Sequence, residues 1–115
     1  MVVVIFEVEI NEGFMDQYLS LAAGLKDLLQ AADGFIRAER FTSLANEGKI
    51  LSLSVWESEE AVSRWRQLAE HRYSQQQGRE TMFKSFRITV ASKLRTYTLD
   101  ERDEAPQDSN DFFAK

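Results

Sequence analysis

Hydrophobic residues follow two different periods along this chain, one of two residues and one of three to four. Every second position from Val2 to Ile10 is apolar and β-branched residues are frequent there, which is typical of a strand. From Phe14 to Ala32 the apolar positions lie three and four residues apart, which predicts a helix with one buried stripe. Gly34 then predicts the end of that helix, because glycine readily adopts the left-handed conformation common at helix ends.

The next part of the chain predicts a hairpin. Residues 35–44 and 50–57 both have strand-like composition, and the turn sequence of residues 46–48, Asn-Glu-Gly, lies between them. In the second of these strands, alternate residues from Leu51 to Val55 are apolar and are expected to face one way.

A second helix and a fourth strand are predicted after the hairpin. Ser58 is a suitable N-cap, and the two glutamates that follow it suit the positive end of a helix dipole. The helical pattern continues through residues 61–76. Residues 86–99 are then expected to form a long strand.

The order strand, helix, strand, strand, helix, strand predicts an α+β domain of ferredoxin-like βαββαβ topology, with two helices on one face of an antiparallel four-stranded sheet. The second face of that sheet is also expected to be apolar. The residues assigned to it are Val3, Ile5, Ile50 and Trp56, with Phe35 or Ile36 and Leu94 or Tyr97. Burial of apolar surface is favourable by roughly 25 cal/mol per Å². We therefore expect a homodimer that packs sheet against sheet, as a dimeric α+β barrel.

Composition narrows the classes of function. The chain has 115 residues and a formal net charge of -5, and this length is enough for one domain. Residues 100–115 hold six acids and two bases, a charge of -4, so the predicted domain of residues 1–99 is nearly neutral. Neither nucleic acid nor a membrane is an expected partner of such a surface. With no cysteine and one histidine, a metal site is not expected either. The cytoplasm is the expected location, because the apolar run from Val2 to Phe6 resembles neither a signal peptide nor a membrane span.

The acidic segment of residues 100–115 has the composition of a disordered tail. It also holds two adjacent aromatic residues, Phe112 and Phe113. We expect these two side chains to anchor the tail, with the partner subunit as one place for the contact.

Four stretches of the chain resemble the antibiotic biosynthesis monooxygenase family of dimeric α+β barrel proteins. They are IFEVEI with Gly13 after it, ADGFI at residues 32–36, LSLSVWESEEAVSRW at residues 51–65, and EHR at residues 70–72. Together they cover about residues 2–98. The resemblance implies a monooxygenase without flavin or metal that oxidises a small aromatic, quinol-like or polyketide-like compound with dioxygen.

The polyketide-oxidising branch of the family implies particular site residues. Trp65 matches a helical tryptophan that contacts the substrate, and His71 stands in place of a tyrosine six residues further on. Ala61 stands where that branch has asparagine, and Arg87 is near the position of a substrate-binding arginine. The resemblance thus implies a pocket in which His71 is the base and Arg87 the cation. Its expected walls are Phe6, Tyr18, Leu53 and Trp65.

The alternatives are a dimeric module that binds a small ligand or haem without catalysis, and a divergent haem-degrading monooxygenase. In the haem-degrading branch a histidine ligates iron and an asparagine assists, and here Gln75 and Phe6 occupy those positions. Trp65 also has a purely structural interpretation as a core residue of its helix. His71 lies roughly 240° from Trp65 around a straight helix, so it also fits a solvent-exposed position. A cavity that contains both side chains would favour the enzyme.

Overall fold

The computed structural model describes the backbone of residues 1–74 and 79–113 and the side chains of residues 1–74 and 81–113. Its elements are β1 (Val2–Ile10), α1 (Met15–Gly24), α2 (Lys26–Gln30), β2 (Phe35–Thr42), β3 (Lys49–Trp56), α3 (Glu59–Ser74), α4 (Arg79–Met82), β4 (Phe83–Ser92) and α5 (Gln107–Phe113). The predicted second helix extends to residue 76, and its last two residues lie outside the described ranges.

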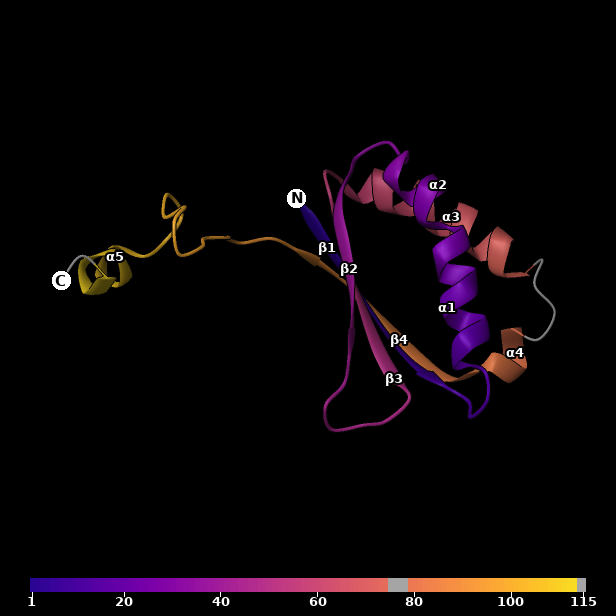
Figure 1. Cartoon of the computed structure of the whole chain (residues 1–115). Helices are drawn as coiled ribbons and strands as arrows, with labels where there is room; N and C mark the ends of the chain where they lie inside the picture. Colours follow the sequence, from indigo (N-terminus) through magenta and orange to yellow (C-terminus); the bar gives the residue numbers. More distant parts are fainter. Residues whose placement is uncertain (75–78, 114–115) are drawn as a thin grey trace.

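The four strands form one antiparallel sheet in the order β2-β3-β1-β4. Helices α1, α2 and α3 lie on the same face of this sheet (Figure 1). The predicted ferredoxin-like α+β topology is therefore confirmed. Within the described ranges, none of the helices combines the length and the apolar character that a membrane span requires.

The register of the strands decides which side chains face the helices. Val2 lies opposite Trp56 and Val8 lies opposite Ile50, and residues directly opposite in an antiparallel pair point to the same face. Trp56 and Ile50 are 0% and 3% exposed, and Val8 is buried with them under the helices. The assignment of Ile50 and Trp56 to the outer face was wrong. Leu53 lies opposite Ile5 and takes that outer position instead.

Close packing at one end of the sheet depends on Gly34, which has φ +83°. A Cβ atom added to Gly34 would lie 2.6 Å from the Cβ of Ala61, which is fully buried in α3. The carbonyl of Gly34 accepts a hydrogen bond of 2.8 Å from the backbone N–H of Glu57. The start of β2 is thus held against the start of α3, where only glycine combines this backbone conformation with the available space.

The fourth strand differs from the prediction because of its partner. It spans residues 83–92 rather than 86–99, and Ser92 lies opposite Val2, the first strand residue of β1. A strand that continued to residue 99 would have no partner on β1. The first predicted helix also differs, because it is divided at Leu25 into α1 and α2, directly after Gly24.

Beyond β4 the chain leaves the sheet as an arm, residues 93–113, and ends in the short helix α5 (Figure 1). The side chain of Arg102 organises this arm. It donates hydrogen bonds to Asn110 Oδ1 and to the carbonyl of Thr98, and its guanidinium lies 5.0 Å from the ring centroids of Tyr97 and Phe113.

Although the composition of residues 100–115 is typical of a disordered segment, residues 107–113 form the helix α5. Phe112 and Phe113 are 70% and 60% exposed, so they are not buried against their own chain. Their anchoring on a partner subunit stays a prediction.

Candidate functional site

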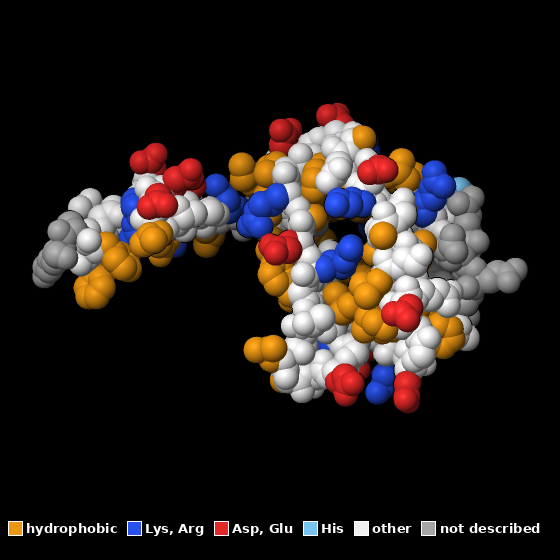
Figure 2. Space-filling model, in the orientation of Figure 1, with side chains coloured by type: hydrophobic (Ala, Val, Ile, Leu, Met, Phe, Trp, Pro, Cys, Tyr) orange, Lys and Arg blue, Asp and Glu red, His pale blue; other side chains and the backbone are white. Residues whose placement is uncertain are grey.

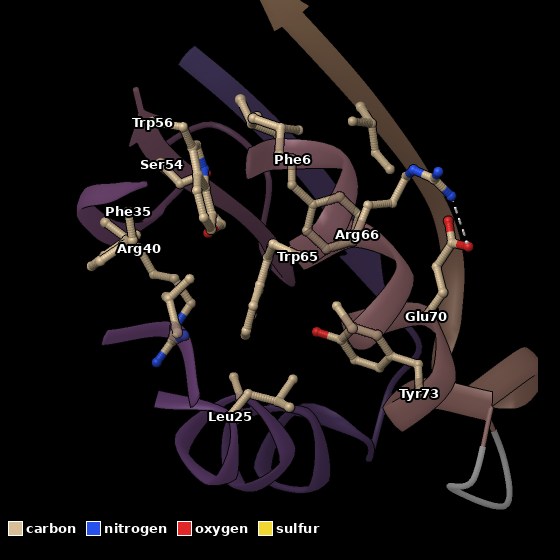
Figure 3. Close-up of a pocket in the computed structure, with 18 of the residues that line it drawn as sticks. Phe6, Leu25, Phe35, Arg40, Ser54, Trp56, Trp65, Arg66, Glu70 and Tyr73 are labelled. Atoms are coloured by element: carbon tan, nitrogen blue, oxygen red, sulfur yellow. Dashed lines mark hydrogen bonds and ion pairs between the residues drawn. The ribbon is translucent and has the colours of Figure 1, made fainter. Parts of the chain in front are cut away.

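A pocket of about 410 Å³ lies between the helix-facing side of the sheet and helices α1, α2 and α3 (Figure 3). This volume is within the range of small-molecule sites. Every strand of the sheet contributes to the lining, and α3 contributes one face. The residues from α3 are Val62, Trp65, Arg66, Ala69, Glu70 and Tyr73.

One aromatic cluster of the pocket is centred on Phe83. Its ring centroid lies 5.9 Å from those of Tyr18 and Tyr73, 6.4 Å from that of Phe6 and 6.3 Å from that of Phe86. Most of these rings meet edge to face, an arrangement that aromatic pairs favour. This cluster joins β1 and β4 to α1 and α3, so it forms a fixed wall.

A second aromatic cluster is centred on Trp56. The centroid of its side chain lies 5.3 Å from that of Phe35 and 6.1 Å from that of Trp65. Ser54 accepts a hydrogen bond of 2.9 Å from the indole N–H of Trp56, which fixes the orientation of this ring. Figure 3 shows Trp65 extending into the space between Trp56 and Tyr73.

Two small side chains on β3, Ser52 and Ser54, make room for the pocket. They lie opposite Phe6 and Val4 of β1, on the helix-facing side of the sheet, and both line the pocket. Large apolar residues at these positions would fill part of the space. The serines are therefore part of the site, although in sequence they resemble the solvent-facing half of a strand.

Tyr18 is a buried phenol in the pocket, with 2% exposure. The pKa of Tyr18 is raised from 10.0 to about 12, mainly by burial and then by the nearby Tyr73, while Arg40 acts in the opposite direction. A phenol with this pKa stays protonated near neutral pH, so Tyr18 can donate a hydrogen bond to a ligand but cannot serve as a base. Figure 3 shows the hydroxyl of Tyr73 also directed into the pocket.

Three of the expected site residues line the pocket, namely Phe6, Tyr18 and Trp65. The other three lie elsewhere. Leu53 and Arg87 are on the outer face of the sheet, where Arg87 lies 3.9 Å from Glu7 in an ion pair and its side chain is 78% exposed. The expected site of a base and a cation beside Trp65 is therefore not formed by His71 and Arg87.

His71 does not line the pocket, because α3 continues without a break from Glu59 to Ser74. On a straight helix, a residue six positions after Trp65 is roughly 240° away from it, whereas a residue eight positions after it is only about 80° away. Tyr73 is eight positions after Trp65 and does line the pocket. This angular rule could have identified Tyr73 from the sequence.

The pocket offers little to a metal or to haem iron. The described part of the chain holds no group of three or more histidine, cysteine, aspartate or glutamate side chains placed to bind a metal ion. No histidine is among the described lining residues. Ligation of haem by histidine is thus not supported by the residues present, and Gln75 lies outside the described ranges.

Sequence comparisons identify relatives of this chain. A sequence model of the family described as "Antibiotic biosynthesis monooxygenase" matches residues 1–77. A relative from Pyricularia oryzae named "Jasmonate monooxygenase ABM" is 39% identical over 90 residues, which are 78% of this chain and 42% of the relative. The chain thus spans less than half the length of that curated relative.

Two solved structures show the same fold at low sequence identity. One is SnoaB from Streptomyces nogalater, a cofactor-independent oxygenase, with a TM-score of 0.69 and 13% identity over 87% of this chain and 97% of that one. The other is Rv0793 from Mycobacterium tuberculosis, with a TM-score of 0.72 and 16% identity over 84% of this chain and 98% of that one.

Proposed function

The chain belongs to the antibiotic biosynthesis monooxygenase family, and on this premise we propose that it oxidises a small, flat aromatic compound with dioxygen without a cofactor. The observation that carries the proposal is the pocket itself. Two aromatic clusters, centred on Phe83 and Trp56, enclose a space that also contains the protonated phenol of Tyr18.

The reaction can proceed without a cofactor if the substrate supplies the electrons. A methylene group activated by neighbouring aromatic rings is oxidised to a carbonyl according to R₂CH₂ + O₂ → R₂C=O + H₂O. The carbon loses four electrons, and dioxygen accepts all of them while one of its atoms enters the product. The protein then has to hold the substrate, exclude water and stabilise negative charge.

The pocket residues suit these three tasks. Trp65 and the Phe83 cluster offer flat apolar surfaces for a ring system, and Phe6 forms part of that wall. The Tyr18 hydroxyl would donate a hydrogen bond to the oxygen on which charge develops once the substrate loses its proton. Loss of a single such donor typically lowers the rate by 10²–10³-fold.

The test is dioxygen uptake with anthrone-like and quinol-like compounds, with a metal chelator present and no flavin added. We expect uptake by the wild type above that of heat-denatured protein, and at least a roughly hundredfold lower kcat for Tyr18→Phe. His71→Ala and Arg87→Ala are matched controls, because both residues lie outside the pocket, and they should keep wild-type turnover.

The same experiment separates the enzyme from a binding module. If the wild type binds these compounds but consumes no dioxygen with any of them, the proposed oxidation is wrong and a ligand-binding role takes its place. If His71→Ala loses turnover and Tyr18→Phe keeps it, the roles assigned to the pocket residues are wrong.

A further inference from the structure

The charges of the pocket are not evenly matched. Three basic residues line it, Lys26 from α2, Arg40 from β2 and Arg66 from α3, together with two acidic residues, Glu39 from β2 and Glu70 from α3. Arg66 is neutralised by Glu70, four residues further along α3, with 3.3 Å between the nitrogen and the carboxylate oxygen. Arg40 and Lys26 form no ion pair with any carboxylate of the described residues. Glu39 lies opposite Leu53, so its side chain starts on the outer face of the sheet. The side of the pocket formed by α2 and β2 therefore has an excess of positive charge.

Arg40 owes its direction to the register of β2. It lies opposite Ser52, whose side chain faces the pocket, so the Arg40 side chain starts on the helix-facing side of the sheet. Figure 3 shows it extending from β2 toward the helical segment that carries Leu25. It is also close enough to Tyr18 to oppose the rise of the Tyr18 pKa.

Most of the remaining lining residues are apolar or aromatic. Figure 2 shows lysine and arginine side chains around a hollow in this face of the molecule. A positive rim on an apolar pocket selects a ligand with an apolar body and one negative end. A guanidinium binds a carboxylate through two parallel hydrogen bonds, which a neutral ligand end cannot offer.

We infer that the substrate of this pocket carries a carboxylate, which Arg40 binds at the rim with support from Lys26. The flat apolar body of the substrate then lies between Trp65 and the Phe83 cluster. The inference rests on the proposed function, because it takes the pocket to be the substrate site. It adds the substrate class, which is aromatic carboxylic acids.

An unpaired arginine on β2 also has a simpler interpretation. The strand lies at the edge of the sheet, and edge strands often carry charged residues that prevent pairing with other chains. Arg37 provides the comparison, because it lies on the same strand opposite Val55, on the outer face, and does not line the pocket. A ligand anchor predicts that only Arg40 affects binding, whereas a role in edge protection predicts that neither residue does.

The experiment measures binding without turnover. Anthraquinone-2-carboxylate is flat and already oxidised at its central ring, so it reports on the pocket alone, and its carboxamide has nearly the same shape without the charge. Quenching of tryptophan fluorescence gives Kd, since both tryptophans of the chain, Trp56 and Trp65, line the pocket. We expect the wild type to bind the carboxylate about tenfold more tightly than the carboxamide.

Variants then assign the preference to a residue. Arg40→Gln should weaken carboxylate binding about tenfold and leave carboxamide binding unchanged, and Arg40→Lys should fall between it and the wild type. Arg37→Gln should bind both ligands as the wild type does. Equal affinity of the wild type for both ligands, or unchanged carboxylate binding by Arg40→Gln, would overturn the inference.

These outcomes are independent of the oxidation itself. If neutral anthrones are consumed with dioxygen but no carboxylate preference exists, the inference fails and the proposed function stands. If the carboxylate binds through Arg40 but no compound is oxidised, the anchor stands and the proposed function fails.

Discussion

Replacement of Tyr18 by phenylalanine should remove a specific dependence of stability on alkaline pH. Tyr18 is buried between the sheet and α1, in ring contact with Phe83. Burial, followed by the neighbouring Tyr73, raises its pKa from 10.0 to about 12. The folded protein therefore keeps this proton at a pH where the unfolded chain has released it.

The sign and the size follow from linkage. The stability associated with a raised pKa is fully present below the pKa of the unfolded chain and is lost as pH rises toward the folded value. A shift from 10.0 to about 12 corresponds to roughly 3 kcal/mol once the pH exceeds both values. At about pH 11 the expected loss from Tyr18 alone is roughly 1 kcal/mol.

Urea unfolding at about pH 8 and about pH 11 measures this loss. Other groups titrate in the same range, so the relevant quantity is the difference between the wild type and Tyr18→Phe. We expect the wild type to lose roughly 1 kcal/mol more of its free energy of unfolding than the variant. In a pH titration followed by near-ultraviolet absorbance, one tyrosine of the wild type should ionise at a higher pH than the others. This high-pH step should be absent in Tyr18→Phe. Equal losses in the two proteins would refute the burial of a neutral phenol in this pocket, and with it the hydrogen-bond role proposed for Tyr18.

Three further predictions test other parts of the structure. Gly34→Ala should lower the free energy of unfolding by more than about 1 kcal/mol, because φ is +83° and the new methyl group would meet Ala61. The control is Gly24→Ala, because a new methyl group at this position of α1 would meet no other atom; it should raise the free energy of unfolding by roughly 0.5–1 kcal/mol. Similar effects of the two substitutions in urea unfolding would contradict the close packing of Gly34 on Ala61. Trp65→Ala should raise the Kd for flat aromatic ligands about tenfold or more in the fluorescence assay, with Trp65→Phe milder, and an unchanged Kd would remove Trp65 from the site. Light scattering should give twice the chain mass of 13.3 kDa, and a folded monomer would count against this expectation. We also predict that the arm anchors on a second copy, so deletion of residues 100–115 should lower Tm, and an unchanged Tm would count against that prediction.

The order of elements was predictable because it depends on local patterns. The alternation in β1 and the three-to-four spacing in α1 and α3 identify the elements, and the element order then identifies the ferredoxin-like topology. It was harder to predict which side of β3 faces the helices. Leu51, Leu53 and Val55 have the pattern of a buried side, while the serines between them have the pattern of a solvent-exposed side. The apolar residues of β1 that face the helices lie opposite Ser52 and Ser54, not opposite the leucines of β3. Serines are found on this buried side because a pocket, rather than a packed core, lies next to them.

The candidate site was predictable only in part. Phe6, Tyr18 and Trp65 lie on elements whose apolar faces were identified correctly, and they do line the pocket. His71 was expected there because the family resemblance places it at a substrate-contacting tyrosine position, but the continuous helix α3 turns it away from the pocket. The role of Arg40 depends on the register of an edge strand, which no local pattern reveals.

The two serines of β3 have a consequence for how this protein could change over generations. Their strand is hydrogen-bonded to a neighbour on each side, so its backbone does not depend on which small or medium side chain occupies either position. Exchange of Ser52 or Ser54 for alanine, valine or leucine would then reshape the cavity stepwise and leave the ladders intact. A lineage could explore new substrates through single codon changes on a rigid strand, without the insertions that proteins with loop-built sites often need.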